Sequence, residues 1–240
     1  MSKVLIIANA ELVESKGTMV SSPVTQIMIN SFRKAIQEEN PTTEVEVIST
    51  ASLWSNPDLY RNKQDDLLCP LTVQLPEWFQ FPNQKIYHDC RQVERLRQWV
   101  KDNLLECGTN GLSSETLGNL WLPVVLTIKG PIYGEVIREE EIPNLYQQPL
   151  DLDDKTRQTL YCLAHKLLEY LAAPASVYLV QFSLLGKEVV FDRLWPFPAA
   201  PAIASLKVQK PNLFDCHWRC LNNQPILDIF IDSQLPLLSK

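Results

Sequence analysis

KVLIIA, at residues 3–8, is a continuous apolar run with no polar face, which is typical of a strand buried on both sides in a parallel sheet. A helix is predicted next, because Ser21 or Ser22 provides an N-cap, Pro23 takes the first helical position, and apolar residues then recur at spacings of three and four. The run EVEVI at residues 44–48 predicts a second strand. Together these elements predict one β-α-β unit with a right-handed crossover.

The alternation of strand and helix patterns continues to about residue 185. Further strands are predicted at residues 71–75, 122–128 and 177–185, with a hairpin at 188–191, and further helices at 89–105 and 153–172. This order is typical of an open, doubly wound parallel α/β sheet. Six prolines and no helical period follow. We therefore expect an α/β domain at residues 1–191 and an irregular, proline-rich extension packed on it at residues 192–240.

The composition argues against several classes of protein. A formal net charge of −6 with no cluster of Lys and Arg argues against nucleic acid or an anionic membrane as the main partner. Only one of the seven glycines, Gly17, lies in the first 107 residues. Neither the glycine-rich dinucleotide fingerprint nor the P-loop is therefore present.

The apolar segments are too short for export or membrane insertion. No stretch approaches the roughly 20 apolar residues of a spanning helix, and the run at residues 4–8 is too short for a signal peptide. We therefore expect a cytoplasmic protein with no integral membrane segment. Its six cysteines are then expected to be reduced thiols and not a disulfide framework.

Ligands bind at the carboxyl ends of the strands in an open α/β sheet, where three predicted loops carry distinctive side chains. Ser21 and Ser22 suit a phosphate at a helix N-terminus, or act only as an ordinary cap. Trp78 and Phe79 suit stacking on a planar heteroaromatic ring, or are plain core residues. The loop at residues 127–134 offers a hydroxyl, backbone N–H groups and a cation, or is merely a hairpin turn.

Taken in order, these motifs resemble the flavodoxin-like NAD(P)H:quinone oxidoreductases and FMN-dependent azoreductases. The matching residues are Ser2 to Ile7, Phe32 through Asn40-Pro41 to Glu44-Val45, Gln74 through Trp78 to Pro82 with Lys85 and Asp89, and Thr127-x-x-Gly130-Pro131 with Tyr133. The resemblance covers about residues 1–185 and rests on the colinear order of the motifs.

The resemblance implies a flavodoxin-like domain that binds FMN and passes hydride from a nicotinamide nucleotide to a quinone-like acceptor. Its implied site residues are Ser21 and Ser22 on the FMN phosphate, Pro76, Trp78 and Phe79 against the flavin ring, Thr127 and Gly130 at the flavin edge, and Lys129 and Tyr133 as catalytic residues. Lys129 would stabilise an anionic reduced flavin. A homodimer is also implied, since related proteins build their site across a two-fold interface.

A second resemblance covers residues 122–200, which are similar to the tail of an ATP-grasp ligase. That family holds Mg²⁺ on the ATP phosphates with an acidic strand residue and a Glu-x-Asn pair. The corresponding positions here hold Gln181, Arg193 and Trp195, none of which can do this job. This resemblance therefore implies a non-catalytic relative.

Two further hypotheses concern metal and protein partners. Cys216, His217 and Cys220, with His88 and Cys90, are spaced more loosely than the usual zinc-binding pairs, so we expect no metal. The alternative to the flavin enzyme is a non-catalytic interaction or assembly protein on a degenerate flavodoxin-like or ATP-grasp-like scaffold. The proline-rich extension would then be the surface on which a protein partner docks.

Overall fold

The structure is a computed structural model that describes residues 3–9, 11–13, 18–61, 66–104, 107 and 117–231. Contacts divide the chain into two compact units, unit 1 at residues 1–91 and unit 2 at residues 92–240. The boundary predicted at residues 191 and 192 falls inside unit 2, and a domain at residues 1–191 stays a prediction. In the parts of the chain that are described, no helix is long and apolar enough to cross a membrane.

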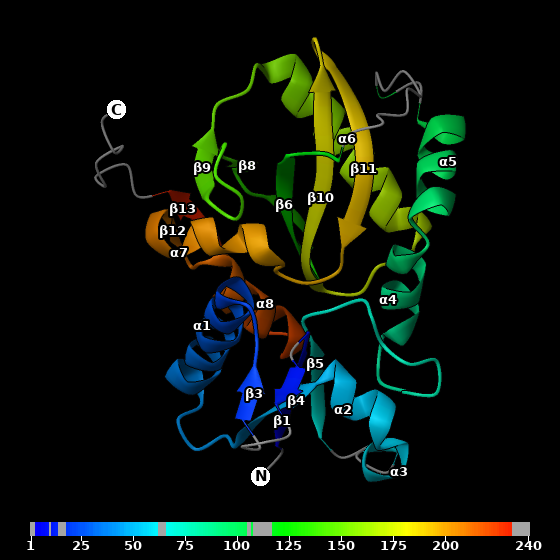
Figure 1. Ribbon diagram of the computed structural model, residues 1–240. Helices are drawn as coiled ribbons and strands as arrows, with labels where there is room; N and C mark the ends of the chain where they lie inside the picture. The colour runs from blue at the N-terminus through cyan, green and yellow to red at the C-terminus, as the bar shows by residue number, and fades with distance from the viewer. Residues whose placement is uncertain are drawn as a thin grey trace. The chain divides into compact units, whose positions relative to one another are not determined.

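Unit 1 is built on a three-stranded parallel sheet in the order β4-β1-β5 (Figure 1). All five residues of β1 are buried, and β1 pairs in parallel with both neighbours. The predicted β-α-β unit is therefore confirmed. The elements of unit 1 are β1 (Val4–Ala8), β2 (Glu11–Val13), β3 (Thr18–Val20), α1 (Pro23–Glu39), β4 (Val45–Ser49), α2 (Thr50–Ser55), α3 (Pro57–Tyr60), β5 (Leu67–Pro70) and α4 (Gln84–Arg91).

Helix α1 forms where the sequence predicts it, because both of its ends are capped by hydrogen bonds and one of its faces is buried. The Thr25 N–H donates to the Ser22 hydroxyl at 3.2 Å, and Pro23 lies in the first turn. At the other end the Asn40 N–H donates to the Ile36 carbonyl at 2.8 Å. The buried face consists of Met28, Ile29, Phe32, Ala35 and Ile36.

The third strand of unit 1 lies earlier than predicted. β5 pairs with β1 between Leu67 and Pro70, whereas the strand predicted at residues 71–75 is absent. The Thr72 hydroxyl accepts a hydrogen bond from the Gln74 N–H at 3.0 Å and donates to Asn9 Oδ1 at 2.8 Å. The bond between Gln74 and Thr72 is a local side-chain to backbone bond of the kind that competes with strand pairing.

Unit 2 is built on a six-stranded antiparallel sheet in the order β11-β10-β6-β8-β9, with β7 also paired to β6 (Figure 1). α5 and α6 pack on β11, and α8 packs on β6 and β10. The elements of unit 2 are α5 (Val93–Asn103), β6 (Leu120–Thr127), β7 (Gly130–Tyr133), β8 (Val136–Glu139), β9 (Tyr146–Leu150), α6 (Asp154–Tyr170), β10 (Ser176–Leu185), β11 (Glu188–Trp195), a 3₁₀ helix (Ala200–Ala204), α7 (Ser205–Val208), β12 (Gln209–Lys210), α8 (Leu213–Leu221) and β13 (Phe230–Ile231).

The predicted open, doubly wound parallel sheet is wrong. Among the strands that the structure describes, parallel pairing is confined to unit 1, and β10 and β6 are antiparallel neighbours in unit 2. Strands do form where the sequence predicts them at residues 122–128 and 177–185, and the apolar runs at residues 120–125 and 176–182 are fully buried. Such a run shows that both faces of a strand are covered, but it does not show the direction of the neighbouring strand.

Residues 192–231, the part of the predicted irregular extension that the structure describes, contain regular elements. The first of these residues continue β11 to Trp195, and α8 follows further on. Asn212 and Asp215 form a reciprocal capping box at the start of α8, where the Asp215 N–H donates to Asn212 Oδ1 and the Asn212 N–H donates to Asp215 Oδ2. The sequence pattern does not reveal this helix because it is only nine residues long and six of its residues are buried, which leaves no clear apolar period.

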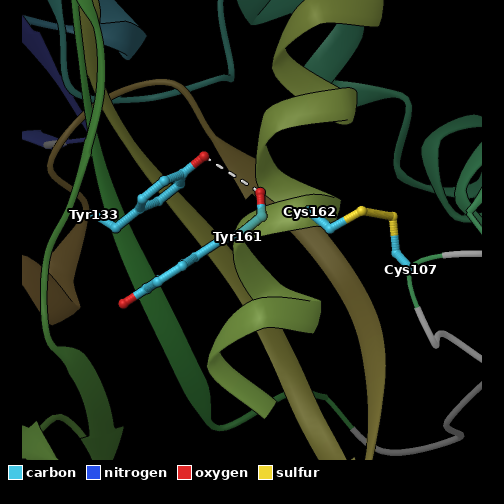
Figure 2. Close-up of a disulfide and its surroundings, with 4 residues drawn as sticks. All are labelled: Cys107, Tyr133, Tyr161 and Cys162. Carbon is cyan, nitrogen blue, oxygen red and sulfur yellow. Dashed lines mark hydrogen bonds between the residues drawn. A yellow bond between two sulfur atoms is a disulfide. The ribbon is translucent and has the colours of Figure 1, made fainter. Parts of the chain in front are cut away.

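A disulfide joins Cys107 to Cys162, so the prediction of reduced thiols is wrong for this pair (Figure 2). The two Cα atoms are 5.7 Å apart, and 55 residues of chain separate the two cysteines. The bond ties the segment after α5 to the middle of α6. The free cysteines of the described chain, Cys69, Cys90, Cys216 and Cys220, are all buried, and burial raises the pKa of their thiols.

Loss of this disulfide is expected to lower the free energy of unfolding by about 2–4 kcal/mol, because the bond restricts a long loop of the unfolded chain. Urea denaturation of the wild type with and without a thiol reductant, and of Cys162→Ser, measures the effect. The reductant should lower the wild-type midpoint to that of the variant and leave the variant unchanged. Equal midpoints for the oxidised and reduced wild type would show that the bond adds no stability.

Candidate functional site

Ser22 caps the first helix of unit 1, and Ser21 lies beside it. Ser22 Oγ accepts from the Thr25 N–H and lies 2.9 Å from Thr25 Oγ1, while Ser21 Oγ donates to the Gln26 side-chain oxygen Oε1 at 3.1 Å. Ser22 therefore has the ordinary capping role considered above, and Ser21 makes a local side-chain bond. Phosphate binding by these residues stays a prediction.

The aromatic loop of unit 1 is a packed turn. The Phe79 N–H donates to the Pro76 carbonyl at 3.1 Å, and Phe79 is buried between the rings of Trp78 and Phe81. The Arg61 guanidinium lies over the Trp78 ring, 5.7 Å from its centroid. These contacts account for the aromatic residues as packing, and a ligand contact through Pro76, Trp78 or Phe79 stays a prediction.

Thr127, Lys129 and Gly130 form the turn between β6 and β7. Thr127 pairs with Gly130 across the hairpin, its hydroxyl donates to the Gly130 carbonyl at 2.9 Å, and it accepts from the Lys129 N–H at 3.1 Å. Gly130 has a φ of 126°, which side-chain-bearing residues rarely adopt. The loop is therefore a hairpin turn, and its contact with a ligand stays a prediction.

Tyr133, the predicted catalytic tyrosine, is held against α6 (Figure 2). Its ring stacks on Tyr161 with centroids 4.2 Å apart, and its hydroxyl donates to the Tyr161 carbonyl at 3.3 Å. Burial raises the pKa of the Tyr133 hydroxyl, with a smaller effect from Tyr161. The Tyr133 hydroxyl is thus kept protonated, and it donates to a backbone carbonyl. Lys129 contributes its backbone N–H to the hairpin turn.

The zinc candidates do not gather into a ligand set. Cys216 Sγ points to the Pro211 carbonyl, Cys220 Sγ to the Leu126 carbonyl, and His217 Nδ1 lies 3.2 Å from Ser176 Oγ. Among the residues described, no group of three His, Cys, Asp or Glu side chains could hold a metal ion.

The structure does bring together Gln181, Arg193 and Trp195, the residues at the ATP-grasp metal positions. Gln181 on β10 is paired with Arg193 on β11, and Trp195 follows two residues later on the same strand. Trp195 Nε1 donates to Gln181 Oε1 at 2.9 Å. The Arg193 guanidinium lies over the Trp195 ring, 5.7 Å from its centroid. We call these three residues the β10–β11 cluster.

A buried carboxylate lies beside the β10–β11 cluster. Asp192 sits at a register shift between β10 and β11 and is 4% exposed. Its Oδ1 forms an ion pair with Arg97 of α5, and its Oδ2 accepts from the Gly118 N–H at 2.8 Å. The Gly118 carbonyl in turn accepts from Gln181 Nε2 at 2.5 Å. One continuous polar network therefore joins α5, residue 118 and the hairpin.

The network requires close approach of the backbone at Gly118. A Cβ atom at this position would lie 2.6 Å from the Phe182 carbonyl oxygen and 2.7 Å from its carbon. Sequence reasoning did not single out Gly118 or Arg97. Gly118 lies outside any turn motif, and the partner of Arg97 is 95 residues away in the chain.

Gly118→Ala is expected to lower the free energy of unfolding by about 1–3 kcal/mol, because strand backbone must move to admit the added methyl group. Gly134→Ala is the matched control, since its nearest atom is a proline side-chain carbon at 3.2 Å. We expect a cost below about 1 kcal/mol there. Chemical denaturation of both variants measures the difference. Equal losses would mean that the backbone contact at residue 118 is not the cause.

Mg²⁺ does not fit the β10–β11 cluster. The Gln181 side-chain amide is bonded at both ends, since its Nε2 donates to the Gly118 carbonyl and its Oε1 accepts from Trp195 Nε1. Both carboxylate oxygens of Asp192 also have partners. The remaining ionic group, Arg193, carries the wrong sign for a cation. Hard divalent cations are held by free carboxylate and carbonyl oxygens, which this arrangement does not offer. No reaction step is therefore derived through a metal ion here.

No family model matches the chain. A stretch of 98 residues, 40% of this chain, is 33% identical to the formate-dependent phosphoribosylglycinamide formyltransferase of Prochlorococcus marinus strain MIT 9515. The match spans only 25% of that relative's length.

Solved structures match nearly the whole chain. Glycinamide-RNase-transformylase T from Mycobacterium tuberculosis matches 93% of this chain and 80% of its own, with a TM-score of 0.66 and 16% identity. N5-carboxyaminoimidazole synthetase from Staphylococcus aureus, complexed with ADP, matches 96% of this chain and 80% of its own, with a TM-score of 0.59 and 9% identity. At these identities the matches establish the fold, which is the ATP-grasp fold.

These comparisons overturn the first resemblance and agree with the second. The flavodoxin-like fold is wrong, and with it the FMN cofactor, the nicotinamide nucleotide, the quinone-like acceptor and the oxidoreductase activity. The alternative of a non-catalytic interaction or assembly protein finds no support either, since the relatives carry the names of enzymes. The flavodoxin resemblance rested on short motifs at the ends of strands, and such motifs do not show in which direction the neighbouring strands run.

Proposed function

We propose that this protein binds a purine nucleotide on its ATP-grasp fold and takes part in the chemistry of phosphoribosyl precursors of purines. The observation that carries the proposal is the structural match over 93% of the chain to a glycinamide transformylase. Because that match extends over both units, both would contribute to the function. The 33% identity with a phosphoribosylglycinamide formyltransferase over 98 residues points to the same chemistry.

The nature of the nucleotide follows from a structural neighbour. The Staphylococcus aureus synthetase is complexed with ADP, so an adenine nucleotide is the first ligand to test. The absence of a glycine-rich phosphate loop in the sequence agrees with this proposal, since the phosphates would be held by side chains of the sheet in place of a P-loop. A cytoplasmic location, expected from the sequence, is part of the same proposal.

Thermal unfolding with added ligands tests the proposal. ADP and ATP should raise the melting temperature of the full chain, with a stabilisation of about 2.7 kcal/mol when the ligand is at 100 times its Kd. FMN and NADPH should leave the melting temperature unchanged. Phosphoribosylglycinamide, added after ADP, should raise it further.

Two results of the thermal unfolding experiment would contradict the proposal, in whole or in part. No shift with millimolar ADP or ATP would remove the nucleotide-binding proposal. A shift with ADP but none with phosphoribosylglycinamide would keep nucleotide binding and remove the proposed precursor chemistry.

A further inference from the structure

We propose that Arg193 binds the phosphate of the nucleotide directly, so that the protein binds its nucleotide without a divalent cation. This inference rests on the proposed function, because it concerns how the same ligand is held. It starts from a disagreement between the ATP-grasp fold and the side chains that occupy the β10–β11 cluster.

The three residues of the β10–β11 cluster form one site. Gln181 and Arg193 are direct partners across the hairpin, and Trp195 bonds to the Gln181 amide at 2.9 Å. The three residues that the ATP-grasp resemblance places at metal-ligand positions therefore share one patch of the sheet. They are best explained together, as one site.

The oxygen atoms at this site that could bind a cation already have hydrogen-bond or ion-pair partners. Gln181 donates to the Gly118 carbonyl and accepts from Trp195, so its amide is satisfied at both ends. Asp192 is bound by Arg97 and by the Gly118 N–H. Among the described residues no cluster of three acidic, histidine or cysteine side chains could hold a metal.

Arg193 places a positive charge where the ATP-grasp resemblance expects a metal ion. Its side chain is 28% exposed, so the residue as a whole is not closed off from solvent. Its Nε is buried, lies 3.5 Å from Asp192 Oδ1, and makes no hydrogen bond with any described residue. The Trp195 ring beneath the guanidinium restricts its position.

These features suit a phosphate. A guanidinium stays protonated at all working pH values and presents planar N–H groups that match the oxygens of a phosphate. A magnesium ion at the same place would be repelled by that charge. The site is therefore suited to an anion where the fold would otherwise place a cation.

Isothermal titration of ADP into the full chain tests the inference. The Kd should agree within about twofold in excess Mg²⁺ and in EDTA. Arg193→Gln should weaken ADP binding at least about tenfold under both conditions, the usual cost of losing a charged hydrogen bond. Arg193→Lys should bind with intermediate affinity. Adenosine, which has no phosphate, should bind the wild type and Arg193→Gln equally.

Arg61→Gln is the matched control. Arg61 also lies over an indole ring at 5.7 Å, but it belongs to unit 1 and contacts Trp78. The variant loses the same charge and the same kind of ring contact, and it should bind ADP as the wild type does. Circular dichroism of both variants confirms that each is folded before titration.

The outcomes separate the two proposals. Binding of ADP that requires Mg²⁺, or that is unchanged in Arg193→Gln, would overturn this inference and leave the proposed function standing. Failure of ADP to bind with or without Mg²⁺ would overturn the proposed function itself, and this inference with it.

Discussion

Asp192→Asn is expected to lower the free energy of unfolding by about 3 kcal/mol, the largest loss we expect from removing a single polar contact. The carboxylate is 4% exposed and pairs with Arg97, and the change leaves that guanidinium without its buried counter-charge. Breaking a buried ion pair from one side costs about 3–5 kcal/mol. The Arg97 side chain is 29% exposed and can regain some hydration, which places the effect at the lower end.

Glu94→Gln is the matched control for this prediction. Glu94 pairs with the same Arg97 at 2.9 Å, but its side chain is 85% exposed. Exposed ion pairs contribute about 0–1 kcal/mol, so Glu94→Gln should unfold almost as the wild type does. Urea denaturation at neutral pH measures both variants. A loss below about 1 kcal/mol for Asp192→Asn would show that the network does not hold α5 to the hairpin.

The second large effect is a loss of stability in mild acid, caused by His217. Its imidazole is fully buried on α8, and burial lowers its pKa to about 3 from the ordinary value of 6.5. Its Nδ1 accepts from the Val177 N–H at 3.5 Å, which requires an unprotonated nitrogen.

The sign of the pH dependence follows from proton binding. Below pH 6.5 the unfolded chain protonates this histidine and the folded protein does not, so acid favours unfolding. The contribution is fully present above pH 6.5 and is lost progressively as the pH falls toward 3. The expected loss is about 2 kcal/mol at pH 5, and on the order of 4 kcal/mol over the full range.

Urea denaturation between pH 7 and pH 4.5 measures this slope. His217→Asn keeps a hydrogen-bond acceptor for Val177 and removes the titrating group, so its stability should vary less with pH. His165→Gln, at an exposed position on α6, should retain the wild-type slope. If His217→Asn also keeps the wild-type slope, a different group is responsible.

Local sequence signals predicted several elements correctly. Ser22, Pro23 and the apolar face of α1 all act within one helix. The helix predicted at residues 153–172 forms as α6, where the Asp153 side chain accepts from the Thr156 N–H at 3.0 Å. Such contacts join residues three or four positions apart, so the linear pattern contains both partners. The hairpin of β6 and β7 was among the alternatives for the same reason, since Thr127 and Gly130 are three residues apart.

The site was harder to predict because its partners are distant in the chain. Gln181, Arg193 and Trp195 were recognised only as residues unsuited to Mg²⁺, and nothing in the sequence shows that they bond to one another. Arg97 and Gly118 carry no motif at all. Their roles arise because the hairpin of β10 and β11 lies beside α5 and residue 118.

The sequence by itself determined the parallel β-α-β start at residues 3–49, the cap of α1, the helix at α6, and the residue types at the β10–β11 cluster. Only the tertiary structure decided that the later strands pair antiparallel and that Asp192 is the buried partner of Arg97. It also decided that Cys107 meets Cys162. The physical reason is that local hydrogen bonds and apolar periodicity depend on residues that are close together in the sequence. Strand direction and long-range pairing depend on which surfaces bury one another when the whole unit packs.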